Sequence, residues 1–435
     1  MARCAALFIH MLLKRPMQQD PFSSARAPGR IHVLEVIGNA IVGGMETYVE
    51  RLVQNLPPER FAVTALCPFE SPFTRRLRAL DIEVLVTPMP DDPLWSSIQM
   101  TCAMVKAGAI DLLHAHLPNA HVLAGIAGRL TAKPVLATLH GHKVGVLDLE
   151  VHRSAGTHLS VVCRQSYFHA LGLGVSAGQL SCNPNGVDTD AFRPRPRPDA
   201  GLRAERRIPA SASLVGFLGR LSPEKGPDVF LRAAMLAQAR LPDAHFVLVG
   251  DGPLAPALRE SIARFGLADR VHLAGLRHDV AGLLNELDVL VSSSHSEAMP
   301  LAVMEAMSSG LPVVATRVGG VPDMIEHGES GWLVTPNDFE DIAVRLQQIL
   351  GNPEELARMG AAARRRAVEQ MSLSDSVERM AALMARLAPS RATQREISGV
   401  VNEPGRRRVP AMRSGTGAIA SAARGEGADA GTRVD

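Results

Sequence analysis

The sequence predicts an α/β protein built from two doubly wound, Rossmann-like domains, and three observations support this prediction. The chain has 435 residues, more than the roughly 250–300 at which a single hydrophobic core stops growing. It is 46% hydrophobic but only 4% aromatic, which suits parallel sheets of Val and Leu covered by Ala-rich helices. Short apolar runs also alternate with helical patterns in two successive series.

The first series spans residues 30–191 and contains short runs rich in β-branched residues. We expect strands at Ile31–Ile37, Phe61–Cys67, Ile82–Thr87, Asp111–His116 and Pro134–His140. Helical patterns such as Met45–Leu56 separate these runs, as in a doubly wound domain.

The second series spans residues 211–371 and repeats this order of elements without repeating the sequence. We expect strands at Ser213–Gly219, His245–Gly250, Val271–Leu276, Asp288–Ser292, Leu311–Thr316 and Gly331–Thr335. Between the series, residues 192–210 carry an Arg-Pro-Arg-Pro-Arg-Pro run that breaks both periodicities and indicates a linker. Two domains that face each other across a cleft follow.

Both ends of the chain differ from this pattern. Residues 1–29 are interpreted as an N-terminal extension or as a translation start placed too early, because the apolar run Ala5–Leu13 is too short to span a bilayer. Residues 390–435 are rich in Arg, Gly, Ala and Ser without apolar periodicity, which predicts a disordered tail.

Charge and cysteine content narrow the function and compartment. A net charge of +2 argues against a dedicated nucleic-acid binder, so no nucleic acid partner is expected. The five cysteines are Cys4, Cys67, Cys102, Cys163 and Cys182. None forms a CxxC pair or a metal-like spacing, which favours free thiols in the cytoplasm and implies no zinc site.

The most informative segment, residues 292–336, places Glu297 and Glu305 around the start of a short helix. We expect Pro300 to be the first residue of this helix and Gly310 to close it. Ligands of open parallel sheets bind beyond the carboxyl ends of the strands, where a helix N-terminus attracts anions. This arrangement suits a sugar nucleotide.

If a sugar nucleotide binds there, the N–H groups of Leu301 and Ala302 would bind its diphosphate. Glu305 would accept hydrogen bonds from the ribose, and Glu297 would face the sugar. The alternative is two surface glutamates that flank a core helix. That alternative explains the helix but not the small-residue loop before it.

Arg220 and Lys225 place two cations beside a turn that follows a strand. Arg offers a planar fork and Lys a compact charge, which together suit a leaving diphosphate as it gains negative charge. Two solvated loop charges are the alternative, and the motif alone does not decide between them.

Two features of the first half point to the same crevice. Gly43 and Gly44 follow the first strand and precede a helical pattern, so the backbone can approach a phosphate or a sugar. His140 ends a strand at its carboxyl end, where a neutral imidazole could hydrogen-bond a sugar hydroxyl. His116 is the second choice, and His114 and His142 are nearby competitors.

These motifs together resemble the retaining GT-B glycosyltransferases, the family labelled glycosyl transferases group 1 or family 4-like, in which two glutamates separated by seven residues mark the donor site. Further matching pieces are Gly43-Gly44-Met45-Glu46, Leu139-His140-Gly141, Asn185-Gly186-Val187-Asp188, the segment from Gly219 to Gly226, and the segment from Val249 to Pro253. The match spans about Ile31 to Pro389. It departs from the family at Ala298-Met299, where members often have Gly-Phe or Gly-Tyr.

The resemblance implies a cytoplasmic enzyme, at or near the inner face of the membrane, that moves a hexosyl unit from a UDP- or GDP-type donor with retention. The acceptor would be a glycan or a lipid-linked hydroxyl in cell-surface polysaccharide or glycolipid synthesis. His140 would contact the donor sugar, and the backbone near Leu276 would contact the base. No cofactor and no metal are implied, and a helix at residues 372–389 would cross back to the first domain.

Two other motifs suggest different chemistry. Residues 250–255 fit the dinucleotide fingerprint G-x-G-x-x-A, but they follow the second strand of their half rather than the first. Asp188-Thr189-Asp190 could hold a metal, yet it sits in a turn beside the linker. The fingerprint therefore carries little weight, and the resemblance implies a structural role for the Asp188 motif.

Residues 72–80 could form a short helix that docks on anionic lipid, with three arginines beside Phe73, Leu77 and Leu80. A solvated basic helix face is the favoured alternative. Two further alternatives concern the whole protein: a sugar-nucleotide epimerase or phosphorylase on the same architecture, and a catalytically inactive module that binds a nucleotide sugar or a partner.

Overall fold

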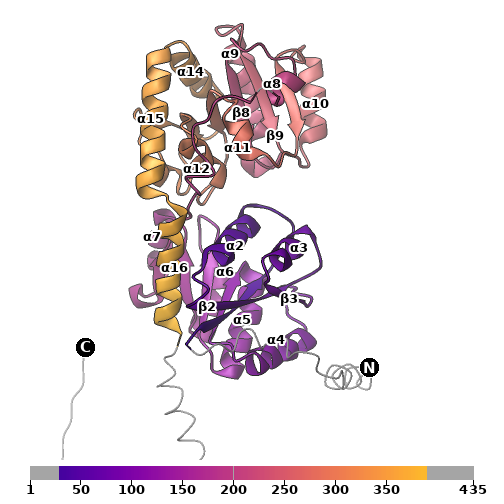
Figure 1. Ribbon diagram of the computed structural model, residues 1–435, viewed down its shortest axis with the longest axis vertical. Coiled ribbons are helices and arrows are strands. Elements are labelled where there is room, and N and C mark those ends of the chain that lie inside the picture. Colours follow the sequence, from indigo (N-terminus) through magenta and orange to yellow (C-terminus); the bar gives the residue numbers. More distant parts are fainter. Residues whose placement is uncertain (1–28, 199, 389–435) are drawn as a thin grey trace, which may run out of the picture. The chain divides into compact units, whose positions relative to one another are not determined.

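The computed structural model describes residues 29–198 and 200–388 (Figure 1). The predicted tail and all but the last residue of the predicted N-terminal extension lie outside the described residues.

Seven parallel strands form the first sheet, in the order β3-β2-β1-β4-β5-β6-β7. They are β1 (Ile31–Ile37), β2 (Phe61–Cys67), β3 (Glu83–Val86), β4 (Leu112–His116), β5 (Val135–Leu139), β6 (His158–Val161) and β7 (Leu180–Cys182). The five predicted strands are confirmed to within one residue at each end. Sequence reasoning missed β6 and β7, because they are short and carry polar residues such as His158, Ser160 and Ser181.

Six parallel strands form the second sheet, in the order β10-β9-β8-β11-β12-β13. They are β8 (Leu214–Leu218), β9 (His245–Val249), β10 (Val271–Gly275), β11 (Val289–Ser292), β12 (Val313–Thr316) and β13 (Gly331–Val334). All six were predicted. The strand order reverses between β1 and β4 in one sheet and between β8 and β11 in the other, and such switch points are where open parallel sheets bind ligands.

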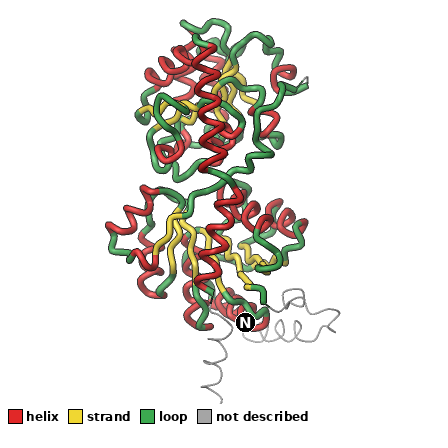
Figure 2. The backbone as a smooth tube through the Cα atoms, turned by 60° about the vertical axis from the view of Figure 1, so that its left-hand side comes forward, coloured by secondary structure: helices red, strands yellow, loops and turns green. Residues whose placement is uncertain are grey.

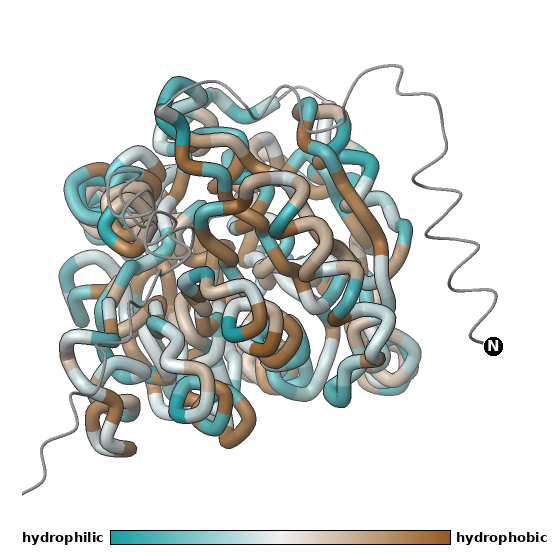
Figure 3. The backbone as a smooth tube through the Cα atoms, turned by 90° about the horizontal axis from the view of Figure 1, so that it is seen from below, coloured by the Kyte–Doolittle hydropathy of each residue, from teal (hydrophilic) through white to brown (hydrophobic). Residues whose placement is uncertain are grey.

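Helices cover both sheets (Figure 2). In the first half they are α2 (Gly44–Asn55), α3 (Pro72–Ala79), α4 (Trp95–Ala107), α5 (Pro118–Thr131), α6 (Val146–Ala155) and α7 (Arg164–Gly172). In the second half they are α8 (Leu202–Glu205), α9 (Pro227–Gln238), α10 (Ala255–Arg264), α11 (Val280–Leu284), α12 (Leu301–Ser308), α13 (Val321–Met324), α14 (Phe339–Leu350), α15 (Pro353–Gln370) and α16 (Leu373–Leu387). Figure 3 shows hydrophobic and hydrophilic residues alternating along the backbone, as expected for elements with one buried face.

Each sheet is buried on both faces. Along β1, Val33 and Ile37 belong to one core cluster, whereas Leu34 and Val36 belong to the other. Because successive side chains of a strand point to opposite faces, Glu35 lies on the same face as Val33 and Ile37. A carboxylate is therefore placed in the middle of a hydrophobic core, where it needs hydrogen-bonding partners.

The last described helix, α16, completes the core of the first sheet. Its buried residues Val377, Met380 and Met384 cluster with residues of β1 and α2. The residues just before and at the start of α16 lie beside Val187, which follows the last strand of the first sheet. Val187 N–H donates to Met371 O at 2.8 Å, and Leu373 N–H donates to Val187 O at 2.9 Å.

Helix α3 does not present the apolar face required for docking on lipid. Phe73 and Leu77 are fully buried in the core, which contradicts the lipid-docking hypothesis for this helix and agrees with the favoured alternative of a solvated basic face. The basic side chains lie outside instead, and Arg78 pairs with Glu70 at 2.6 Å. Within the described residues, no helix combines the length and hydrophobicity needed to cross a bilayer.

Candidate active site

The loop after β11 carries Glu297 and leads into α12, which carries Glu305. Glu297 and Glu305 are each more than 90% buried. The helix begins at Leu301, so Pro300 is the N-cap with extended backbone rather than the first helical residue. This correction leaves the N–H groups of Leu301 and Ala302 in the first turn, where no intrahelical acceptor reaches them. Gly310 follows the helix with a φ of +79°.

Glu297 is paired with a cation from the neighbouring loop. Its Oε1 accepts hydrogen bonds from Lys225 Nζ at 2.7 Å and from Ser294 Oγ at 2.8 Å. The two loops also touch through their backbones, because His295 N–H donates to Glu224 O at 2.9 Å. Gly226 permits this approach, since a Cβ there would lie 2.3 Å from Ser293 O. The structure thus brings together Lys225 and Glu297, as the motifs predict.

A glycine pair supports the glutamate loop from behind. Gly319 has a φ of +54°, and a Cβ at this position would lie only 1.6 Å from Glu297 O. Gly320 N–H donates to Ala298 O at 2.6 Å. Sequence reasoning missed this support. The Gly-Gly dipeptide between β12 and α13 was the feature that could have indicated it.

The other predicted site residues of the second half, Arg220 and Leu276, also follow the carboxyl ends of strands. Arg220 follows β8, is exposed, and pairs with no carboxylate among residues 29–198 and 200–388. Its guanidinium is therefore available to an anion. Leu276 follows β10 and is 69% exposed.

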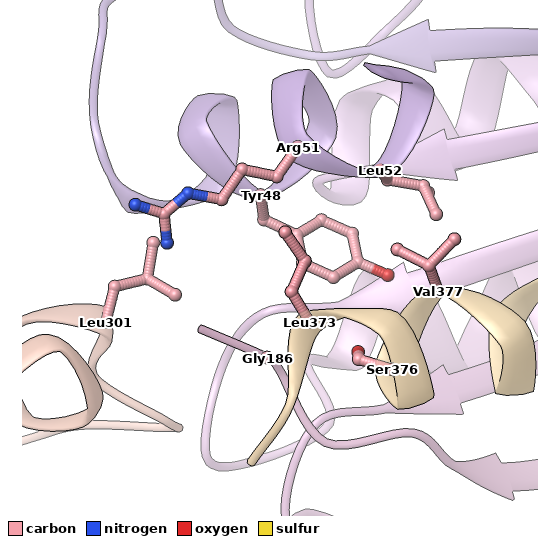
Figure 4. Close-up of a pocket in the computed structure, with 8 residues that line it drawn as sticks. All are labelled: Tyr48, Arg51, Leu52, Gly186, Leu301, Leu373, Ser376 and Val377. Carbon is pink, nitrogen blue, oxygen red and sulfur yellow. The ribbon is translucent and has the colours of Figure 1, made fainter. Parts of the chain in front are cut away.

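Glu305 pairs with a residue that sequence reasoning missed. Arg51 on α2 donates to Glu305 Oε1 at 2.6 Å. Its guanidinium lies beside Leu301, and together with Tyr48 it lines a cavity of about 10 Å³ (Figure 4). That volume suits about one water molecule and no larger ligand. Nothing in the local sequence pattern marks Arg51 as different from the other exposed-face residues of an amphipathic helix.

In the first half, the predicted backbone site is open. Gly44 begins α2, and a Cβ built on it would meet no atom within 4 Å. Gly43 is the N-cap with extended backbone, and both glycines are exposed. A ligand can therefore approach the first turn of α2 closely.

Five polar residues form a connected network across β1, β4 and the end of β5. Glu35 Oε2 lies 3.0 Å from His114 Nδ1 and 2.8 Å from His116 Nε2. The other nitrogen of His114 contacts Thr138 Oγ1 at 2.7 Å. The other nitrogen of His116 contacts His140 Nε2 at 3.0 Å.

This network corrects the second-choice assignment of His116. His116 is fully buried and both of its ring nitrogens are engaged, so it offers no free atom to a substrate. Its position is behind His140, which is partly exposed. Burial lowers the pKa of His140 well below 6.5, which keeps this ring neutral at pH 7.

The buried histidines make stability depend on pH. Burial lowers the pKa of His116 to about 4 and that of His158 to about 4, compared with 6.5 for a free histidine. Because the unfolded chain binds these protons more readily, the stabilisation is full above pH 6.5 and is lost as pH falls toward 4.

We therefore expect the melting temperature to decrease when the pH is lowered from 7 to 5. His116 alone should lower the free energy of unfolding by about 1–2 kcal/mol at pH 5. Thermal unfolding followed by circular dichroism at both pH values measures this. Glu35 should not contribute to the loss, because its lowered pKa of about 2 matters only below its unfolded value of 4.5. An unchanged melting temperature would contradict the assignment of neutral buried histidines.

The two competing motifs have structural roles in this fold. Asp188 Oδ1 accepts from Asp190 N–H at 3.0 Å and from Ala191 N–H at 2.9 Å, which is an Asx turn. Gly250 and Gly252 pack on the turn after β8, because a Cβ on Gly250 would lie 2.0 Å from Gly219 O. Both glycines thus serve strand packing.

Two parallel, doubly wound sheets with ion-paired glutamates around the start of a helix are typical of the class of α/β proteins whose ligands bind beyond the carboxyl ends of the strands. Comparison with known proteins identifies the family. Residues 200–366 match the model of the glycosyl transferases group 1, and residues 42–191 match the model of glycosyltransferase family 4.

Similar proteins with assigned activities come from several bacteria. A GDP-mannose-dependent alpha-(1-6)-phosphatidylinositol monomannoside mannosyltransferase of Mycolicibacterium smegmatis is 31% identical over 280 residues, which cover 60% of this chain and 73% of the relative. A UDP-Gal:alpha-D-GlcNAc-diphosphoundecaprenol alpha-1,3-galactosyltransferase of Escherichia coli is 27% identical over 341 residues, which cover 74% of this chain and 88% of the relative.

Among solved structures, Anabaena HepE in complex with UDP-glucose has the same fold, with a TM-score of 0.74 at 23% identity over 82% of this chain and 100% of that chain. The chain belongs to the GT-B glycosyltransferases of family 4. The predicted fold class is confirmed.

Proposed function

We propose that this protein transfers a hexosyl unit from a nucleoside diphosphate sugar, of UDP or GDP type, to a hydroxyl of a glycan or lipid-linked acceptor, with retention at the anomeric carbon. The observation that carries the proposal is the Lys225–Glu297 ion pair beside the free N-terminus of α12. A cation, a buried carboxylate and unpaired N–H groups together suit a sugar diphosphate.

In this proposal the second half holds the donor. The diphosphate lies on the N–H groups of Leu301 and Ala302, and Arg220 and Lys225 stabilise its charge as the bond to the sugar breaks. Glu297 faces the sugar. Glu305 receives the ribose, and Arg51 must share or release its carboxylate when the nucleotide binds. The backbone near Leu276 contacts the base.

The first half supplies the opposite wall and the acceptor. Gly43 and Gly44 let the backbone approach the phosphate or the sugar, and His140 contacts the sugar. The leaving diphosphate stays near the anomeric carbon and takes the proton of the attacking hydroxyl, so positioning and charge stabilisation are the work of the protein. No residue is assigned to a metal or cofactor.

Relatives motivate the choice of donors and acceptors. The mannosyltransferase of M. smegmatis is named for GDP-mannose and a phosphatidylinositol mannoside, and the galactosyltransferase of E. coli for UDP-Gal and a diphosphoundecaprenol-linked sugar. Both acceptors are lipid-linked. The proposal therefore includes a role in cell-surface polysaccharide or glycolipid synthesis, in the cytoplasm with peripheral contact to the anionic inner face of the membrane.

A thermal-shift panel of UDP, GDP, ADP and their common sugar conjugates tests the donor site. Ligand at 100 times its dissociation constant should stabilise the protein by about 2.7 kcal/mol. We expect one base to give a selective shift, and Glu305→Ala to remove it because the ribose loses its acceptor. Glu340→Ala on the exposed face of α14 is the control and should keep the shift.

The same panel separates the alternatives. Absence of any shift in the folded wild type would refute nucleotide-sugar binding. A selective shift without transfer to any glycan or lipid-linked acceptor would favour the inactive module, and turnover without such an acceptor would favour an epimerase or phosphorylase.

A further inference from the structure

The buried carboxylate of Glu35 is not used by the mechanism above, although it is linked to His140. Glu35 is 0% exposed, and its hydrogen-bonding partners among the described residues are His114 and His116. Burial opposes its charge, but the hydrogen bonds from His114 and His116 favour the ionised form, and the pKa of Glu35 is lowered to about 2. Glu35 is therefore an ionised carboxylate that can only accept hydrogen bonds.

An acceptor at one end of the network determines where each proton lies. His116 Nε2, 2.8 Å from Glu35 Oε2, must carry a proton. His116 is neutral at pH 7, so its Nδ1 has a lone pair and accepts from His140 Nε2 at 3.0 Å. His140 is neutral as well. Its proton therefore lies on Nε2, and its Nδ1 carries a lone pair.

Only the Nδ1 atom of His140 remains available to a ligand. Its Nδ1 has no hydrogen-bond partner in the part of the chain that the structure describes. The ring of Tyr48 packs edge-on against it, with 5.0 Å between ring centroids, which restricts its orientation. Such a ring can accept a hydrogen bond from a sugar hydroxyl but cannot donate one.

We propose that Glu35 is a positioning residue that acts through His116 to hold the proton of His140 on Nε2, which leaves Nδ1 as a hydrogen-bond acceptor for the donor sugar. The contact with the sugar rests on the proposed function, whereas the order of protons does not. His140 consequently serves as an acceptor that orients a hydroxyl, and not as a general acid.

A metal ion is the competing explanation of the network, because one ligand atom each of Glu35, His114 and His116 lies within 4.8 Å of the others. A metal would require lone pairs on His114 Nδ1 and His116 Nε2. The hydrogen bonds to an ionised Glu35 require protons on these same atoms. The two explanations therefore predict opposite protonation of the same nitrogens.

Nitrogen-15 NMR of the full-length protein labelled at histidine tests this order directly, since protonated and unprotonated ring nitrogens have well-separated shifts. We expect protons on Nε2 of His140, Nε2 of His116 and Nδ1 of His114. A proton on His140 Nδ1, or unprotonated nitrogens facing Glu35, would overturn the proposal. This arm requires neither a variant nor an active enzyme, so it stands even if the proposed function fails.

Two matched variants test the consequence for catalysis. Asp148 is also buried and contacts His121 at 2.9 Å, whose other nitrogen reaches Thr157 at 2.8 Å. This second network repeats the chemistry of Glu35, His114 and Thr138 without a link to His140. Glu35→Leu and Asp148→Leu therefore remove similar interactions, and only the first should affect the site.

We expect Glu35→Leu to mix the tautomers of His140 and to lower kcat by about 10-fold or more, as in other sites where a histidine loses its orienting carboxylate. The dissociation constant for the nucleoside diphosphate should change by less than about two-fold, because the other sheet holds the nucleotide. Asp148→Leu should lower only the melting temperature. Equal losses of kcat in both variants, or an unchanged His140 tautomer in Glu35→Leu, would overturn the proposal. If Glu35→Leu does not fold, the wild-type spectrum decides.

Discussion

Replacing Lys225 with alanine should lower kcat/KM by roughly 10²–10³-fold, the usual effect of removing one preorganised donor from a developing negative charge. Its Nζ is held 2.7 Å from Glu297 Oε1, so the ammonium is already in place before the diphosphate arrives. Loss of this charge should be felt mainly in the transition state, when the diphosphate departs. Initial rates of nucleoside diphosphate release, with the donor that gives the thermal shift, measure the effect.

A second lysine controls for charge removal. Lys106 is exposed in the last turn of α4, and Lys106→Ala should leave the rate within about two-fold. If Lys225→Ala raised only KM while kcat stayed at the wild-type value, Lys225 would bind the ground state and the transition state equally. The proposed role in leaving-group stabilisation would then be wrong.

Replacing Gly319 with alanine should destabilise the protein by about 2–6 kcal/mol and weaken donor binding, through the sum of backbone strain and overpacking. The added Cβ would lie 1.6 Å from Glu297 O, a distance that no flexible side chain can relieve. The loop that carries Glu297 must therefore move. Chemical unfolding and the nucleotide-induced thermal shift, measured on the same preparation, report both effects.

Gly156→Ala is a control that separates the cost of backbone strain from the cost of the steric clash with Glu297. Gly156 ends α6 with a φ of +69°, similar to that of Gly319, but a Cβ there would meet no atom within 4 Å. Gly156→Ala should therefore cost only about 1 kcal/mol and leave donor binding intact. Equal destabilisation by both substitutions would show that the contact with Glu297 is relieved at no cost.

Local patterns were sufficient to predict the succession of strands and helices along the chain, but not the shortest strands. Long apolar runs such as Phe61–Cys67 are identified by length and β-branching. Strand β7 has three residues, of which two are polar or partly exposed, so its place in the sheet depends on pairing with β6 rather than on its own sequence. Tertiary contacts decide such elements.

Some residues of the candidate site were also predictable from the sequence, and others were not. Glu297, Lys225 and the presence of α12 after β11 were predictable because they follow predicted strands at the edge where ligands bind, although the helix starts one residue later than predicted. Glu35 was not, since it lies inside a strand that reads as continuous core, and its role depends on histidines 79 and 81 residues away. Arg51 pairs with a partner 254 residues away. A single sequence contains no local pattern for such pairs.

The contribution of α16 to the first core has a consequence for synthesis on the ribosome. All strands of the first sheet have been synthesised once translation reaches Val187. Val377 and Met380, which complete the core on one face of this sheet, are synthesised about 190 residues later. At 5–20 residues per second, this face of the nascent domain waits about 10–40 s for the helix that covers it. We therefore expect the N-terminal half to reach its final packing only after α16 has been synthesised.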